Sequence, residues 1–278
     1  MDTDGRKNRL AIIDRIAEYE RNEWFECDVE DDPPTRPLTP GEVDYAKRKL
    51  TSKIKTFVAN RVAHAYFERL IRRGELVIKE VRGIENYRAV NGGAMLTCNH
   101  FNAYDNYAVF KAIERELPTR ELYKIIREGN YTSFGGIYGY FFRNCNTLPL
   151  GSNVHVLAEL GEGVKTLLAR GEKILIYPEQ GMWWNYRKPR PLKDGAFRFA
   201  AKNGVPVIPF FISMEDTDRT DPNGFPIQAY TVHIMPAIYP DPDRSVRENC
   251  AAMRDRNYQL LKEKYEEVYG IPLTYSGK

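Results

Sequence analysis

Apolar and polar residues follow two different periods along the chain, and the changes between them mark the expected elements. Apolar residues at three- and four-residue spacing predict helices, and short apolar runs predict strands. The helical pattern covers residues 7–22, 42–73, 105–116, 154–169, 195–202 and 245–268. The strand pattern covers residues 75–81, 94–98, 122–126, 173–177, 206–212 and 229–235. Strands that alternate with helices predict an α/β fold, with a largely parallel or mixed sheet flanked by helices.

The first 74 residues lack strand patterns and form an N-terminal amphipathic helical region. Its first helix places Leu10, Ile13 and Ile16 on one side, and the acidic segment 26–40 contains four prolines, which indicates an exposed linker. We therefore divide the chain into an extension with its linker (1–40) and one α/β domain (41–278).

The helix expected at the start of that domain (41–74) is strongly basic. Between residues 47 and 73 there are nine Lys or Arg residues (47, 48, 49, 53, 55, 61, 69, 72, 73) and one acid, Glu68. A cationic amphipathic helix suits an anionic membrane surface. The alternative is a solvated charged face over a packed core, and the pattern leaves both open.

Composition narrows the class of protein further. Hydrophobic residues at 42% and a net charge of +3 describe an ordinary globular chain, and they give no sign of a nucleic-acid partner. The four cysteines are widely spaced, which is typical of free thiols in a reducing cytoplasm. The start has no signal-peptide pattern, and the most apolar run, 205–214, is too short to span a bilayer. We expect a cytoplasmic protein, peripheral on the inner face of the membrane.

The segment "LTCNHFNAYDN" (96–106) carries the main candidate chemistry. His100 follows an apolar strand, and Asp105 stands five residues later at the expected start of a helix. Ligands of α/β sheets collect at the carboxyl ends of strands. On a continuous helix the two side chains would diverge by about 140°, so they meet only across a turn. A carboxylate that orients an imidazole makes a base that works near neutral pH. The alternative is a plain helix cap beside an unrelated histidine.

The rest of the chain offers this base no protein nucleophile. It has no G-x-S-x-G motif, and a cysteine inside a strand, such as Cys98, is usually inert. The other histidines are scattered, so we expect no metal site. The natural substrate of such a base is an external hydroxyl that attacks an acyl donor. Two further segments suit this chemistry: Arg143 follows an aromatic run, and "YPEQGMWW" (177–184) ends a strand before two tryptophans, which we expect to be partly exposed.

Four ordered blocks resemble the glycerolipid acyltransferase family, typified by 1-acylglycerol-3-phosphate (lysophosphatidic-acid) acyltransferase. "NHFNAYD" matches N-H-x-x-x-x-D in full, "YGYFFR" resembles G-x-x-F-x-R, "YPEQG" resembles F-P-E-G-T-R, and "VPVIPF" resembles V-P-x-x-P-V. The resemblance spans roughly residues 75–240.

The resemblance implies a role for each matching residue. His100 would be the general base and Asp105 would orient it, while Asn99, Arg143, Glu179 and Gly181 would bind substrate. The donor would be acyl-CoA or acyl-carrier protein, used as a substrate, with no cofactor. The acceptor would be a lysophospholipid, most simply 1-acylglycerol-3-phosphate, so the enzyme would serve phospholipid biosynthesis.

One departure affects the acceptor. The third block lacks its usual arginine, and three nearby cations are candidates to replace it at a phosphate: Arg187, Lys188 and Arg190. If none does, the chain takes a lysolipid without a phosphate, or it is a catalytically disabled lipid-binding protein at the membrane surface.

Overall fold

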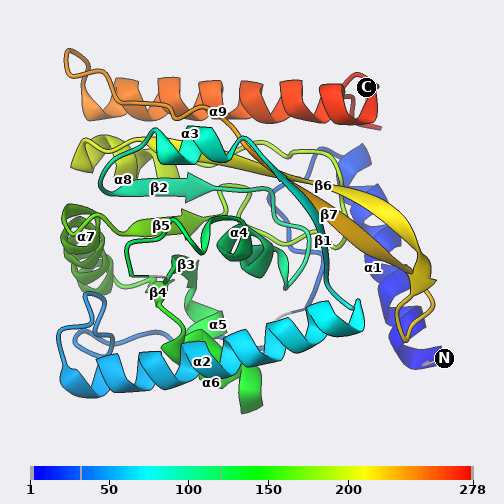
Figure 1. Ribbon diagram of the computed structural model, residues 1–278, viewed down its shortest axis with the longest axis horizontal. Helices are drawn as coiled ribbons and strands as arrows, with labels where there is room; N and C mark the ends of the chain where they lie inside the picture. Colours follow the sequence, from blue (N-terminus) through cyan, green and yellow to red (C-terminus); the bar gives the residue numbers. More distant parts are fainter. Residues whose placement is uncertain (1–2, 32, 120, 277–278) are drawn as a thin grey trace.

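The computed structural model describes residues 3–31, 33–119 and 121–276, and within them seven strands form a single sheet (Figure 1). The strands are β1 (Val77–Arg82), β2 (Ala94–Thr97), β3 (Tyr123–Arg127), β4 (Thr147–Leu150), β5 (Lys173–Ile176), β6 (Val207–Thr220) and β7 (Pro226–Ile234). The helices are α1 (Thr3–Arg21), α2 (Leu50–Arg73), α3 (Ile84–Arg88), α4 (Asp105–Ile113), α5 (Glu128–Thr132), α6 (Gly136–Asn144), α7 (Val154–Ala169), α8 (Gly195–Asn203) and α9 (Val246–Tyr269). The predicted α/β class is confirmed.

The sheet is mixed, with strand order β1-β7-β6-β2-β5-β3-β4. All neighbouring strands run parallel except β6 and β7, which form a long antiparallel hairpin. The carboxyl ends of β2, β3, β4, β5 and β6 therefore lie at one edge of the sheet, where ligand sites of this fold class usually form.

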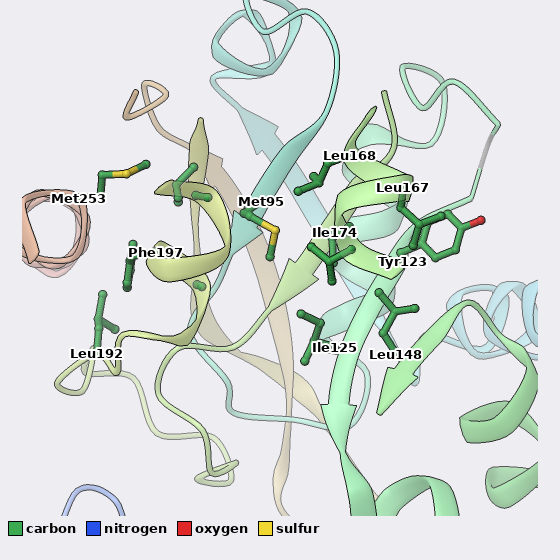
Figure 2. Close-up of a cluster of buried hydrophobic side chains, with 14 of the residues drawn as sticks. Met95, Tyr123, Ile125, Leu148, Leu167, Leu168, Ile174, Leu192, Phe197 and Met253 are labelled. Atoms are coloured by element: carbon green, nitrogen blue, oxygen red, sulfur yellow. The ribbon is translucent and has the colours of Figure 1, made fainter. Parts of the chain in front are cut away.

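Helices cover both faces of the sheet. Neighbouring residues of a strand point to opposite faces, so each strand contributes to two cores. Met95 and Ile174 face a core shared with α7, α8 and α9, which also holds Leu167, Phe197 and Met253 (Figure 2). Their neighbours in sequence, Leu96 and Leu175, face a second core built with α3 and α4. Because both faces are buried, these strands appear in the sequence as uninterrupted apolar runs without alternating polar residues.

The sequence pattern missed β4 because "TLPL" contains Pro149. The strand pairs on one side only, with β3, and an edge strand tolerates a proline that lacks an amide hydrogen.

Helix α2 starts eight residues later than expected. Lys47 has a left-handed backbone (φ 49°), and the Asp44 carboxylate accepts from the amides of Arg48 and Lys49 (2.9 and 2.8 Å). This turn ends the segment that precedes the helix.

The orientation of α2 differs from that of an ordinary amphipathic helix. It turns its small residues inward, with Ala59 and Ala63 buried against Cys145. Five large apolar residues in its first thirteen positions are 41–71% exposed, whereas Leu70 near its end is buried: the exposed ones are Leu50, Ile54, Phe57, Val58 and Val62. We call these five the apolar face of α2. No helix in the described residues combines the length and apolarity needed to cross a bilayer.

The N-terminal region packs onto the domain more closely than an exposed linker would. Val29 and Leu38 are 0% and 2% exposed, and Leu38 donates its amide to Glu128 (2.6 Å). On α1 the buried apolar residues are Ile12 and Ile16, whereas Leu10 and Ile13 of the predicted apolar side are exposed. The prediction of an exposed linker is therefore wrong at these positions. Val29 packs with Trp183 in the loop that follows β5 (residues 177–194), which we call the third-block loop, and Leu38 packs in the core beside α7.

Candidate active site

Strand β2 carries the site residues to the carboxyl edge of the sheet. After the strand ends, the Asn99 side chain continues the pairing towards β6: its Oδ1 accepts from the amide of Ile212 (2.8 Å) and its Nδ2 donates to the carbonyl of Ile212 (3.0 Å). Asn99 is 2% exposed. Both ends of its amide bond to β6, so Asn99 positions the next residue, and its predicted contact with substrate stays a prediction.

His100 and Asp105 meet across a turn, as the dyad hypothesis requires. His100 Nδ1 lies 2.7 Å from Asp105 Oδ2, and the same oxygen accepts from the amides of Phe101 and Asn102 (3.0 and 3.2 Å). An ionised carboxylate only accepts, so Nδ1 carries the hydrogen and Nε2 holds a free lone pair. The Asp105 side chain is completely buried, whereas that of His100 is 20% exposed. The arrangement leaves Nε2 able to receive a proton.

Tyr177 completes this group, and the sequence reasoning missed it. Its hydroxyl donates to Asp105 Oδ1 (2.6 Å), and its ring stacks on His100 with 3.9 Å between centroids. Burial, together with the charge of Asp105, holds the pKa of Tyr177 well above its usual range, so the hydroxyl stays a donor. Its place at the carboxyl end of β5, just before Pro178 and Glu179, was the available signal.

Cys98 lies close to the dyad but is inert. Its thiol is buried, and this burial, followed by the charge of Asp105, raises its pKa well above the usual range. The expectation that Cys98 is no nucleophile agrees with this environment.

Glu179 ties the third-block loop to the dyad. Its Oε2 accepts from the amide of His100 (3.2 Å) and from Arg190 Nη2 (3.0 Å), and both side chains of this ion pair are at most 2% exposed. Arg190 also donates to the carbonyl of Gly181, and its guanidinium lies 4.7 Å from the centroid of Trp183. Arg190 is buried and saturated, so its prediction as a phosphate ligand is wrong.

The other two candidate cations are also held by acids. Arg187 pairs with Asp216 (2.6 Å), and Lys188 pairs with Glu20 of α1 (2.6 Å). The structure therefore gives no support to a phosphate site built from this loop. Trp183 is completely buried, contrary to the expectation of partial exposure. Residues 24–31, which we call the N-terminal segment, cover it, and the carbonyl of Cys27 accepts its indole N–H (3.0 Å).

Arg143 lies near the end of α6 and holds the chain that enters this helix. Its Nη1 donates to the carbonyls of Phe134 (3.0 Å) and Tyr131 (3.4 Å). Among the described residues it forms no ion pair with an acid. These contacts give Arg143 a structural task, and its role towards an acceptor phosphate stays a prediction.

A different arginine lies at the carboxyl edge. Arg127 is the last residue of β3, and it donates from Nη1 and Nη2 to the two oxygens of Asp28 (2.7 and 2.5 Å). The pair lies over Gly181: a Cβ on this glycine would be 2.8 Å from Asp28 Oδ1 and 3.5 Å from Arg127 Nη2. The sequence reasoning missed both residues, because nothing in the sequence places residue 28 beside residue 181.

The comparisons with known proteins fit this site. Residues 78–213, which include the dyad, Tyr177 and the third-block loop, match the model of the family described as Acyltransferase. The fold is similar to the crystal structure of the 1-acyl-sn-glycerophosphate (LPA) acyltransferase PlsC from Thermotoga maritima. The TM-score is 0.53 and the identity 20%, over 82% of this chain and 86% of that one. No curated protein matches the sequence at a significant level. The predictions of an acyltransferase and of a resemblance to the glycerolipid family are confirmed.

Proposed function

Because the chain carries an acyltransferase domain, we propose that it transfers a fatty acyl group from a thioester to a hydroxyl of a lysolipid. The observation that carries the proposal is the His100–Asp105 contact of 2.7 Å, with Nε2 left open at the sheet edge. The donor is acyl-CoA or acyl-carrier protein, and both present the same thioester.

In the proposed reaction, His100 Nε2 removes the proton from the acceptor hydroxyl as its oxygen attacks the thioester carbonyl. The tetrahedral intermediate collapses, the C–S bond breaks, and the thiol leaves with the proton that the imidazolium returns. Asp105 stabilises the imidazolium and fixes its tautomer. Tyr177 supports both groups, because it donates to Asp105 and stacks on the His100 ring.

The place of the reaction follows from the surface of α2. We propose that the apolar face of α2 lies on the inner face of the membrane. Exposed cations such as Lys49, Lys53 and Lys55 flank it. Five large apolar side chains exposed on one side of a helix are unfavourable in water, whereas they are stabilised at a lipid interface. The neighbouring α6 adds exposed Ile137 and Tyr138 to the same surface.

The alternative of a disabled lipid-binding protein has less support. A lipid binder has no need of a buried carboxylate with four donors, one of which is the imidazole. The similarity of the fold to PlsC makes 1-acylglycerol-3-phosphate the first acceptor to test, and an uncharged lysolipid is the second.

An acyl-transfer assay with both thioester donors and a panel of lysolipids tests the proposal. His100→Ala should lower turnover about 10²–10⁴-fold, the usual effect of losing a general base. His155→Ala is the matched control, because this histidine is exposed at the start of α7 and takes no part in the dyad. A folded His100→Ala protein with wild-type turnover would disprove the mechanism. No transfer by the wild type to any lysolipid would disprove the function itself.

A further inference from the structure

The Asp28–Arg127 pair lies at the carboxyl edge of the sheet, against the loop that contacts His100. Glu179 contacts the amide of His100, and Gly181 follows two residues later. The pair packs against Gly181, and the amide of Trp183 in the same loop donates to the carbonyl of His100 (3.2 Å). The pair therefore lies against the loop that bonds to both the amide and the carbonyl of the catalytic histidine.

The pair is reachable from solvent, unlike the Arg190–Glu179 ion pair of this loop. The Arg127 and Asp28 side chains are 38% and 46% exposed, whereas Arg190 and Glu179 are 1% and 2% exposed. A head group that reaches this loop can therefore contact Asp28 and Arg127, but not the buried Arg190–Glu179 pair. The remaining candidate cations are engaged elsewhere, Arg187 and Lys188 with acids and Arg143 with carbonyls.

A phosphate head would find this position unfavourable. Asp28 already uses both oxygens to bind the guanidinium face that a phosphate would need, because a bidentate Arg–carboxylate pair has the geometry of an Arg–phosphate pair. A phosphate placed beside the pair would also face a carboxylate of the same sign. Neutral hydroxyls avoid both problems, since the Asp28 oxygens have further lone pairs that can accept from them.

We propose that Asp28, contributed by the N-terminal segment, is a specificity-determining residue that makes the enzyme prefer a lysolipid with an uncharged, hydroxyl-bearing head over one with a phosphate. This inference rests on the proposed acyl transfer and names its acceptor class. It also gives the N-terminal segment a task at the site: the segment supplies the carboxylate that stands over the third-block loop.

The test compares two acceptors with the same acyl chain, 1-oleoylglycerol and 1-oleoylglycerol 3-phosphate, with acyl-CoA as donor. The wild type should show the higher kcat/KM for 1-oleoylglycerol. Asp28→Asn removes one negative charge with little change of shape, and it should raise kcat/KM for the phosphate-bearing acceptor about fivefold. Asp28→Glu keeps the charge and should keep the wild-type preference.

Asp31→Asn is the matched control, because it makes the same charge change in the same segment on a 93% exposed side chain next to Arg15. This variant should keep the wild-type ratio of the two kcat/KM values. A wild type that prefers the phosphate-bearing acceptor overturns the inference and leaves acyl transfer intact. Equal changes of this ratio in Asp28→Asn and Asp31→Asn also overturn the inference, because the effect would then come from the net charge of the protein and not from Asp28. If Asp28→Asn does not fold, the wild-type preference and Asp28→Glu decide.

Discussion

At the scale of single residues, Asp105 and His233 show two opposite ways in which burial serves this protein. Asp105 is buried with four donors around it, so its charge is supported at the site. His233 is buried on β7 and lies 2.9 Å from the hydroxyl of Ser213. Burial, helped by the positive charges of Lys264 and Arg82, lowers the pKa of His233 to about 4. This histidine is therefore neutral in the folded protein.

The pKa of His233 predicts a dependence of stability on pH. Below about pH 6.5 an unfolded histidine binds a proton that the folded protein does not accept until about pH 4, so stability falls as pH falls through this window. Between pH 7.5 and 5 the loss from this residue should be about 2 kcal/mol. Urea unfolding at both pH values should show a smaller loss for His233→Gln than for the wild type. The exposed His155→Gln should behave like the wild type, and an equal loss in all three would contradict the assignment.

The sequence predicted part of the site and not the rest, for a physical reason. His100 and Asp105 are five residues apart, so local geometry was enough to bring them together. The fates of Arg190 and Arg127 depend on Glu179 and Asp28, 11 and 99 residues away. Whether a cation is free for substrate is a property of its partner, and no spacing rule locates a distant partner.

At the scale of elements, α2 carries the surface that we propose for contact with a membrane. Its pattern predicted a helix correctly but did not reveal which side faces the protein. Small residues such as Ala59 and Ala63 allow a close approach to α6, and the five side chains of the apolar face are left outside. Hydrophobic spacing alone identifies a stripe, whereas the size of the opposing residues decides the packing.

The exposed surface of α2 predicts binding to anionic vesicles. Replacing Lys49, Lys53 and Lys55 with Gln should weaken co-sedimentation at least tenfold, because each cation near an anionic surface contributes about 1 kcal/mol. Binding should also weaken as salt rises, since exposed charges are screened within about 10 Å at 0.1 M salt.

A matched triple variant, Lys165, Lys202 and Lys262 to Gln, removes the same charge from α7, α8 and α9. It should bind like the wild type. Equal weakening in both triple variants would show that overall charge, and not α2, attracts the membrane.

At the scale of the whole molecule, residues near both ends of the chain meet on the third-block loop. Glu20 of α1 is buried, and it accepts from Lys188 (2.6 Å), from the Tyr186 hydroxyl (2.9 Å) and from the amide and hydroxyl of Ser276 (2.8 and 2.9 Å). Tyr275 adds a hydrogen bond from its hydroxyl to the carbonyl of Pro189 (2.6 Å). The loop that follows the catalytic strand β5 is thus held by segments from far along the chain.

This network predicts a large effect of Glu20→Ala on stability. The change leaves Lys188 and Tyr186 without their partner, and an abandoned buried donor or charge costs about 2 kcal/mol or more. Urea unfolding should show this loss. Glu18→Ala on the exposed side of α1 should change stability by less than about 0.5 kcal/mol. Similar losses of stability in the two variants would contradict this prediction, because the effect would then come from a general change in helix α1 and not from the contacts of Glu20.

The crowding of aromatic rings around this loop has an optical consequence. The three tryptophans of the chain are Trp24, Trp183 and Trp184, and all belong to this region: Trp24 packs on Tyr19, Trp183 on Phe25, and Trp184 on Phe225. The sheet core contains none. Tryptophan fluorescence therefore reports mainly on the contact between the N-terminal segment and the loop, so a shift of tryptophan emission without a change in circular dichroism would signal that this segment has left the loop.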